Sequence, residues 1–202
     1  MKNQIGNKTI INAVTKYYMF AIKEYYLNNL FSDCRKQVLI AECDLHYKIE
    51  FYLEFYKGYD NNIGDISASY HPYTNPYKII LTFVTHKLFS EKSLYNLYPY
   101  IKGALVHEIE HHLQNIKFPF REDLNVHCHK TIDYINSISE IEAYSKELYS
   151  LHKQTKESFH KILTQEAYNI TDNEEETNIF ISNIVSFLTR RKDLNLFANI
   201  RF

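Results

Sequence analysis

The spacing of hydrophobic residues divides the chain into a first part that mixes a helix with strands and a second part that is helical. Apolar residues recur every three or four positions over residues 9–30, which predicts a helix with Thr9 capping its start. Aromatic-rich, partly alternating residues at 46–56 predict a half-buried strand, and shorter strands are expected at 66–70 and 77–84. The first 90 residues therefore predict one helix and a small, mostly antiparallel sheet.

From Ser93 onward the pattern is helical. Helices are expected at residues 98–117, 130–152 and 155–168, and a last one begins near Asp172. Three glutamates at 174–176 suit the amino end of that last helix, and three basic residues at 190–192 suit its carboxyl end. We expect an α+β fold in a single domain, 1–202, with a helix and sheet in residues 1–90 and a helical half in residues 93–202.

Composition narrows the class of protein. The 202 residues carry 23 Lys and Arg against 24 Asp and Glu, a formal net charge of −1, so the chain lacks the basic excess of a general nucleic-acid binder. No apolar run has the length of a transmembrane helix, and the first residues do not resemble a signal peptide. Cys34, Cys43 and Cys128 form no CxxC motif, which favours a reducing, cytoplasmic location. The oligomeric state is left open.

The most informative motif is HExxH, which runs from His107 to His111. Residues four apart on a helix differ by about 40° around its axis, so both imidazoles leave one face and can bind a single Zn²⁺. Glu108 lies about 100° away, where it can reach a water at the metal and act as general base. The two histidines lie opposite the apolar stripe of this helix, whereas His112 falls within that stripe and is expected to be structural.

A catalytic zinc site needs a third protein ligand, and the next helix offers two glutamates. Glu140 and Glu142 point about 160° apart, so only one of them can face the metal. We prefer Glu140, which shares an edge of its helix with Tyr144.

Two other patterns compete with this interpretation. The same five residues also match the inverted order HxxEH, in which Glu110 would be the base, although the position of Glu140 fits the first order better. His127 and His129 flank Cys128, but alternate residues of a helix point apart and no partner spacing is present, so we expect no second metal site there.

HExxH followed by Glu140-Ile141-Glu142-Ala143 resembles the gluzincin zinc metallopeptidases, particularly their small single-domain members. The match spans roughly residues 103–147. The resemblance implies a zincin-like fold with a twisted sheet, aligns Glu140 with the third zinc ligand, and implies an edge strand that holds an extended peptide, for which residues 77–84 are the candidate. Tyr144 stands where many gluzincins carry an Asp that orients the first histidine.

These observations lead to a zinc-dependent peptidase as the expected function, with Zn²⁺ as cofactor and a peptide or protein as substrate. His107, His111 and Glu140 would bind the metal, Glu108 would be the general base, and Tyr144 or another tyrosine would stabilise the oxyanion. The alternative is a zincin-like binding or regulatory domain in which metal only joins two helices and nothing is hydrolysed. Neither nucleic acid nor a membrane is expected as a partner.

Overall fold

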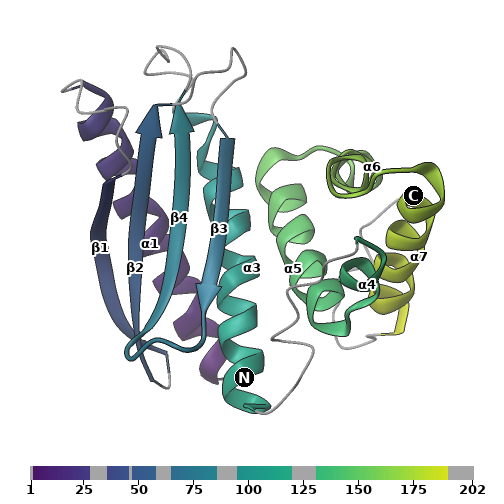
Figure 1. Cartoon of the computed structure of the whole chain (residues 1–202), viewed down its shortest axis with the longest axis horizontal. Coiled ribbons are helices and arrows are strands. Elements are labelled where there is room, and N and C mark those ends of the chain that lie inside the picture. Colours follow the sequence, from purple (N-terminus) through teal and green to yellow (C-terminus); the bar gives the residue numbers. More distant parts are fainter. Residues whose placement is uncertain are drawn as a thin grey trace. The chain divides into compact units, whose positions relative to one another are not determined.

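The computed structural model describes residues 2–27, 36–45, 47–57, 65–85, 95–119 and 131–190. Within these residues the fold class is α+β, as expected, with a four-stranded sheet followed by helices (Figure 1). The chain divides into two compact units, residues 1–109 and 110–202, and the division falls within the helix that carries HExxH. Among the described residues, none of the helices has the length and apolar character needed to span a lipid bilayer.

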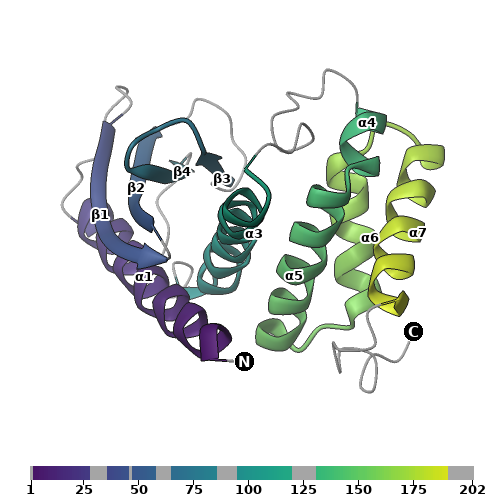
Figure 2. The ribbon, with the colours of Figure 1, turned by 90° about the horizontal axis from the view of Figure 1, so that it is seen from below.

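The first unit contains one long helix, the sheet and the beginning of a second helix. Its elements are α1 (Lys2–Leu27), β1 (Lys36–Leu45), β2 (Tyr47–Lys57), β3 (Asp65–His71), β4 (Tyr77–Thr85) and the first part of α3 (Tyr98–Lys117). Helix α1 already covers Thr9, so this residue is not the cap that the sequence suggested. α1 and the first part of α3 lie on the same face of the sheet (Figures 1 and 2).

The sheet has the order β1-β2-β4-β3 and is mostly antiparallel, as expected, but its central pair is parallel. In that pair Ile49 is opposite Tyr77 and Lys57 is opposite Thr85. β4 is therefore bonded on both sides, so the expectation that residues 77–84 form the edge strand is wrong. The edge beyond β4 is β3.

β1 is a strand that the hydrophobic pattern did not reveal. Its pairing with β2 shifts register between Leu39 and Ala41, because one extra residue forms a bulge. A bulge reverses which face the following residues occupy, so the simple alternation that marks a strand is lost across this segment.

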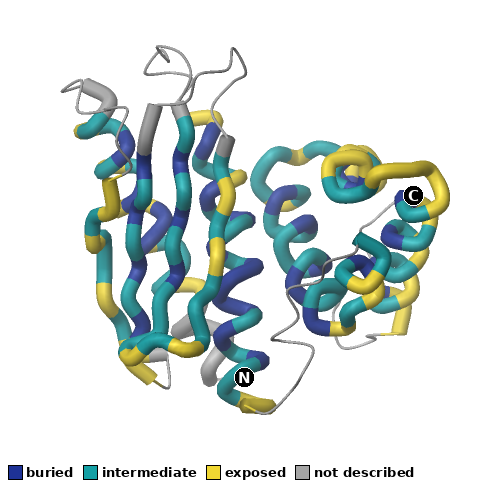
Figure 3. Tube along the Cα trace, viewed as in Figure 1, coloured by how far each residue is buried: buried dark blue, intermediate teal, exposed yellow. Residues whose placement is uncertain are grey.

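The core of the first unit follows the two-residue period of the central strands. Alternate residues of β2 and β4 are at most 1% exposed, and the residues between them are half-buried (Figure 3). The buried residues of these two strands are Ile49, Phe51, Leu53, Phe55, Ile79, Leu81 and Phe83. Helix α1 contributes Val14, Tyr18 and Ile22 to the buried residues, and the Tyr18 hydroxyl donates to the backbone carbonyl of Tyr52 at 2.9 Å.

The second unit contains the end of α3 and four further helices. These are α4 (Thr131–Asn136), α5 (Ile138–Thr155), α6 (Phe159–Ile170) and α7 (Glu174–Arg190). The single helix expected at 130–152 is thus two helices, which break at Ser137, where the backbone is extended. Ser158 caps α6, since its hydroxyl accepts from the backbone N–H of Lys161, and this explains why α6 begins later than expected.

α4 to α7 pack around one apolar core, which includes Leu148, Phe159, Phe180 and Ile184. Glu174, Glu175 and Glu176 occupy the first turn of α7 and Arg190 its last turn, as the dipole argument expected. The side chain of Asn173 accepts from the backbone N–H of Glu176 and caps the helix start. The two basic residues at 191–192 lie outside the described residues.

Candidate metal centre

His107 and His111 lie one turn apart on α3, as the motif predicts. His107 is 6% exposed, and His111 is partly buried. Glu108 and Glu110, the two candidates for general base, are also buried on this helix. His107, Glu108 and Glu110 are therefore shielded from open solvent although they are polar or charged.

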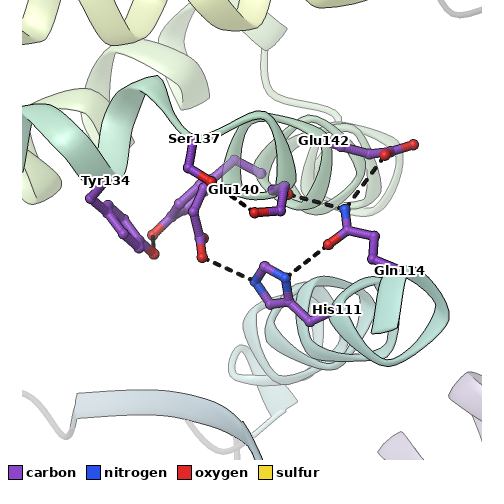
Figure 4. Close-up of polar contacts among 8 residues, drawn as sticks. His111, Gln114, Tyr134, Ser137, Glu140 and Glu142 are labelled. Atoms are coloured by element: carbon purple, nitrogen blue, oxygen red, sulfur yellow. Dashed lines mark hydrogen bonds and ion pairs between the residues drawn. The ribbon is translucent and has the colours of Figure 1, made fainter. Parts of the chain in front are cut away.

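Glu140 is the third residue of α5, in the first turn, where a carboxylate is favoured by the helix dipole. Its Oε1 lies 3.4 Å from Nε2 of His111, and the two side chains are only 17% and 13% exposed (Figure 4). One ligand atom from each of His107, His111 and Glu140 lies within 4.8 Å of the others. The three residues chosen from the sequence as metal ligands are thus brought together.

The two candidate ligands of α5, Glu140 and Glu142, have different partners. Glu140 faces His111, whereas Glu142 Oε2 is 3.5 Å from the Gln114 amide nitrogen and its Oε1 is 3.5 Å from Lys146 Nζ. This separation is the one that helical geometry predicts for residues two apart. Of the two candidates, Glu140 is the one that lies close to both histidines.

Glu110 forms an ion pair with Lys146 of α5. Its Oε2 lies 2.5 Å from Lys146 Nζ, and the Glu110 side chain is 9% exposed. This ion pair gives Glu110 a charged partner on α5. The preference for Glu108 over Glu110 as the base still rests on the HExxH order.

Tyr144 is engaged with a second tyrosine. Its hydroxyl lies 3.1 Å from that of Tyr134, and its ring packs edge-on against Phe180 in the apolar core of the second unit. Burial raises the pKa of the Tyr134 phenol, and the neighbouring Tyr144 and a hydrogen bond with Glu140 add to the rise. Burial likewise raises the pKa of Tyr144, with the nearby charge of Glu147 next in importance. Both phenols therefore stay protonated beside the Glu140 carboxylate.

Sequence reasoning did not identify two residues of this site. Gln114 contacts His111 and α5, and the signal available for it was its spacing, three residues after His111 and hence on the same face of the helix. Tyr134 belongs to α4, and no motif marks it. His112 is completely buried, as expected for a structural histidine. His127, Cys128 and His129 lie outside the described residues.

The donor set fits zinc, and one of its spacings has the length that zinc requires. Two histidines and a glutamate form one of the ligand sets that catalytic zinc sites use. Two ligand atoms bound to a tetrahedral zinc at their usual bond lengths lie about 3.3 to 3.4 Å apart. The distance of 3.4 Å between His111 Nε2 and Glu140 Oε1 has this value, whereas a charge-assisted hydrogen bond is usually about 2.7–2.9 Å long.

No protein-family model, curated protein or solved structure matches the chain.

Proposed function

We propose that this chain is a zinc-dependent peptidase in which His107, His111 and Glu140 bind the metal. The observation that carries the proposal is the convergence of these three side chains, from two helices, with ligand atoms within 4.8 Å of one another. Ligand atoms at a tetrahedral zinc lie about 3.3 to 3.4 Å apart, so a bound zinc would draw the outer pair closer together.

The reaction assigned to the site is hydrolysis of a peptide bond. Zinc, when bound, supplies a Lewis acid for the scissile carbonyl and lowers the pKa of water to about 7. Glu108 accepts a proton as the water oxygen bonds to the carbonyl carbon, and it passes that proton to the amine when the C–N bond breaks. Tyr144 remains a candidate for the oxyanion, a role in which its hydroxyl would have to leave Tyr134.

The proposed substrate is an extended peptide. The resemblance to gluzincins implies that such a peptide pairs with an edge strand, and β3 now replaces residues 77–84 as the candidate. Ser67 and Ser69 of β3 are exposed, and an edge strand offers unpaired backbone groups for an added strand. We also propose a reducing compartment, because Cys43 is a free thiol and the chain has no CxxC motif.

The test is Glu108→Gln, which keeps the size of the side chain and removes the base. We expect this variant to bind one zinc per chain, measured by elemental analysis, and to lose about 10²–10⁴-fold in hydrolysis of a peptide library. Glu110→Gln is the companion variant that tests the inverted order, and it should retain most of the hydrolysis. A Glu108→Gln protein that cleaves as fast as the unaltered chain refutes the assignment.

A second function is a metal-joined binding domain without hydrolysis. Tyr144 favours it, since this residue stands where many gluzincins carry an aspartate and its hydroxyl is hydrogen-bonded to that of Tyr134. In that case a chelator should unfold the second unit, as measured by circular dichroism. The zinc-loaded protein should then cleave no peptide in the library. Hydrolysis that is lost on chelation and restored by zinc excludes this alternative.

A further inference from the structure

The side chain of Gln114 joins His111 to the start of α5. It is 4% exposed, and it lies three residues after His111, on the same face of α3. Its Oε1 is 3.1 Å from His111 Nδ1, and its Nε2 is 3.1 Å from the backbone carbonyl oxygen of Ser139, the residue before Glu140 (Figure 4). One buried amide thus contacts both the second histidine and the turn that presents the carboxylate.

The partners of this amide fix its orientation. A backbone carbonyl only accepts hydrogen bonds, so the NH₂ group of Gln114 must face Ser139. The same NH₂ group lies 3.5 Å from the Glu142 carboxylate, a second acceptor, which Lys146 contacts from its other oxygen. The flipped amide would set its oxygen against both of these acceptors, so the observed orientation is strongly preferred.

This orientation determines which nitrogen of His111 carries hydrogen. The amide oxygen of Gln114 only accepts, so Nδ1 of His111 must be the donor in their 3.1 Å contact. In the neutral imidazole Nε2 then holds the lone pair, and it is Nε2 that faces Glu140. A lone pair and a carboxylate oxygen facing each other at 3.4 Å repel, and a cation between them removes the repulsion.

We propose that Gln114 is a positioning residue that holds His111 in the tautomer needed to bind zinc through Nε2. Its contact with the Ser139 carbonyl also couples the ring orientation to the first turn of α5, from which Glu140 projects. Partners of this kind around a metal-binding histidine set its tautomer and raise metal affinity. The zinc part of this inference rests on the proposed function, whereas the placement of hydrogen on Nδ1 stands without it.

The first experiment compares Gln114→Met with Gln154→Met. Methionine has nearly the length of glutamine and lacks the amide, and Gln154 is a matched control because its Nε2 also donates to a backbone carbonyl, that of Ser150, at 3.1 Å. We expect Gln114→Met to bind zinc about 10–100-fold more weakly in competition with a chelator of known affinity, and Gln154→Met to bind as the unaltered chain does. Equal zinc affinity in all three proteins overturns the role of Gln114.

The second experiment needs no Gln114 variant and so does not depend on that variant folding. In ¹⁵N NMR of the unaltered chain, with and without zinc, we expect hydrogen on Nδ1 of His111, assigned by its loss in His111→Gln. A bare Nδ1 with hydrogen on Nε2 overturns the inference. The two failures are distinguishable, since a chain that binds no zinc but shows hydrogen on Nδ1 contradicts the proposed function alone, and a zinc-binding chain with a bare Nδ1 contradicts only the role of Gln114.

Discussion

The buried face of the sheet and the polar cluster of the second unit both exclude solvent, but they are stabilised by different kinds of contact. We define the polar cluster as Glu110, His111, Gln114, Ser139, Glu140, Glu142 and Lys146. On the buried face of the sheet every buried side chain of β2 and β4 is apolar. The hydrophobic effect that stabilises these side chains does not depend on the direction of any one contact. In the polar cluster Glu110, Gln114 and Ser139 are buried, and each depends on a specific partner.

The difference shows what a single substitution can do in each region. Removing an apolar side chain loses transfer free energy and leaves a cavity, with a cost set by volume. Removing one member of a polar pair leaves the other buried and uncompensated, with a cost that a second substitution can relieve.

The largest effect is expected inside the sheet. Phe51 is fully buried, so Phe51→Ala should lower the free energy of unfolding by about 4 kcal/mol, measured by chemical denaturation. Tyr52→Ala is the matched control on the other face, where the side chain is half-buried and its hydroxyl donates to Glu50; we expect about 1 kcal/mol there. Equal losses would contradict the assignment of an inner and an outer face.

In the polar cluster we expect a smaller loss of stability, which a second substitution can restore. Lys146→Met removes the ammonium that lies 2.5 Å from the buried Glu110 carboxylate, and it should cost about 2 kcal/mol in the free energy of unfolding. Adding Glu110→Gln to this variant should restore most of the loss, because a neutral amide is cheaper to bury than a carboxylate. A double variant no more stable than Lys146→Met would show that the two residues do not act as a pair.

The smallest effect is expected at the surface of the second unit. Lys161 and Glu157 form an ion pair one turn apart, with side chains 55% and 37% exposed. Lys161→Ala should change the free energy of unfolding by about 0.3 kcal/mol, and raised salt should reduce even this difference. A loss comparable to that of Lys146→Met would mean that exposure is a poor guide to the strength of ion pairs in this chain.

The sequence predicted those features that depend on neighbours along the chain. Regular alternation in β2 and β4, the bounds of α3 and the shared face of His107 and His111 all follow from local periodicity. The bulge in β1 could not be predicted, because a bulge interrupts the alternation of buried and exposed residues. The parallel β2–β4 pairing could not be predicted either, because strand order depends on contacts distant in sequence.

The candidate site likewise combines features that follow from local sequence with contacts that depend on how helices pack. The HExxH spacing and the position of Glu140 on the next helix could be deduced from helical geometry. The contacts of Gln114 with the Ser139 carbonyl and of Lys146 with Glu110 could not, since each joins two helices through side chains whose directions depend on packing.

The parallel pairing in the middle of the sheet has a consequence for the order in which the chain folds. β1 with β2 and β3 with β4 are each pairs of sequence neighbours, so each hairpin can form from local contacts. Only β2 with β4 joins the two hairpins, through partners such as Phe51 and Ile79 that are distant along the chain. The pairing of β2 with β4 orders the longest stretch of backbone, so we expect this pairing to be the slow step in assembling the sheet.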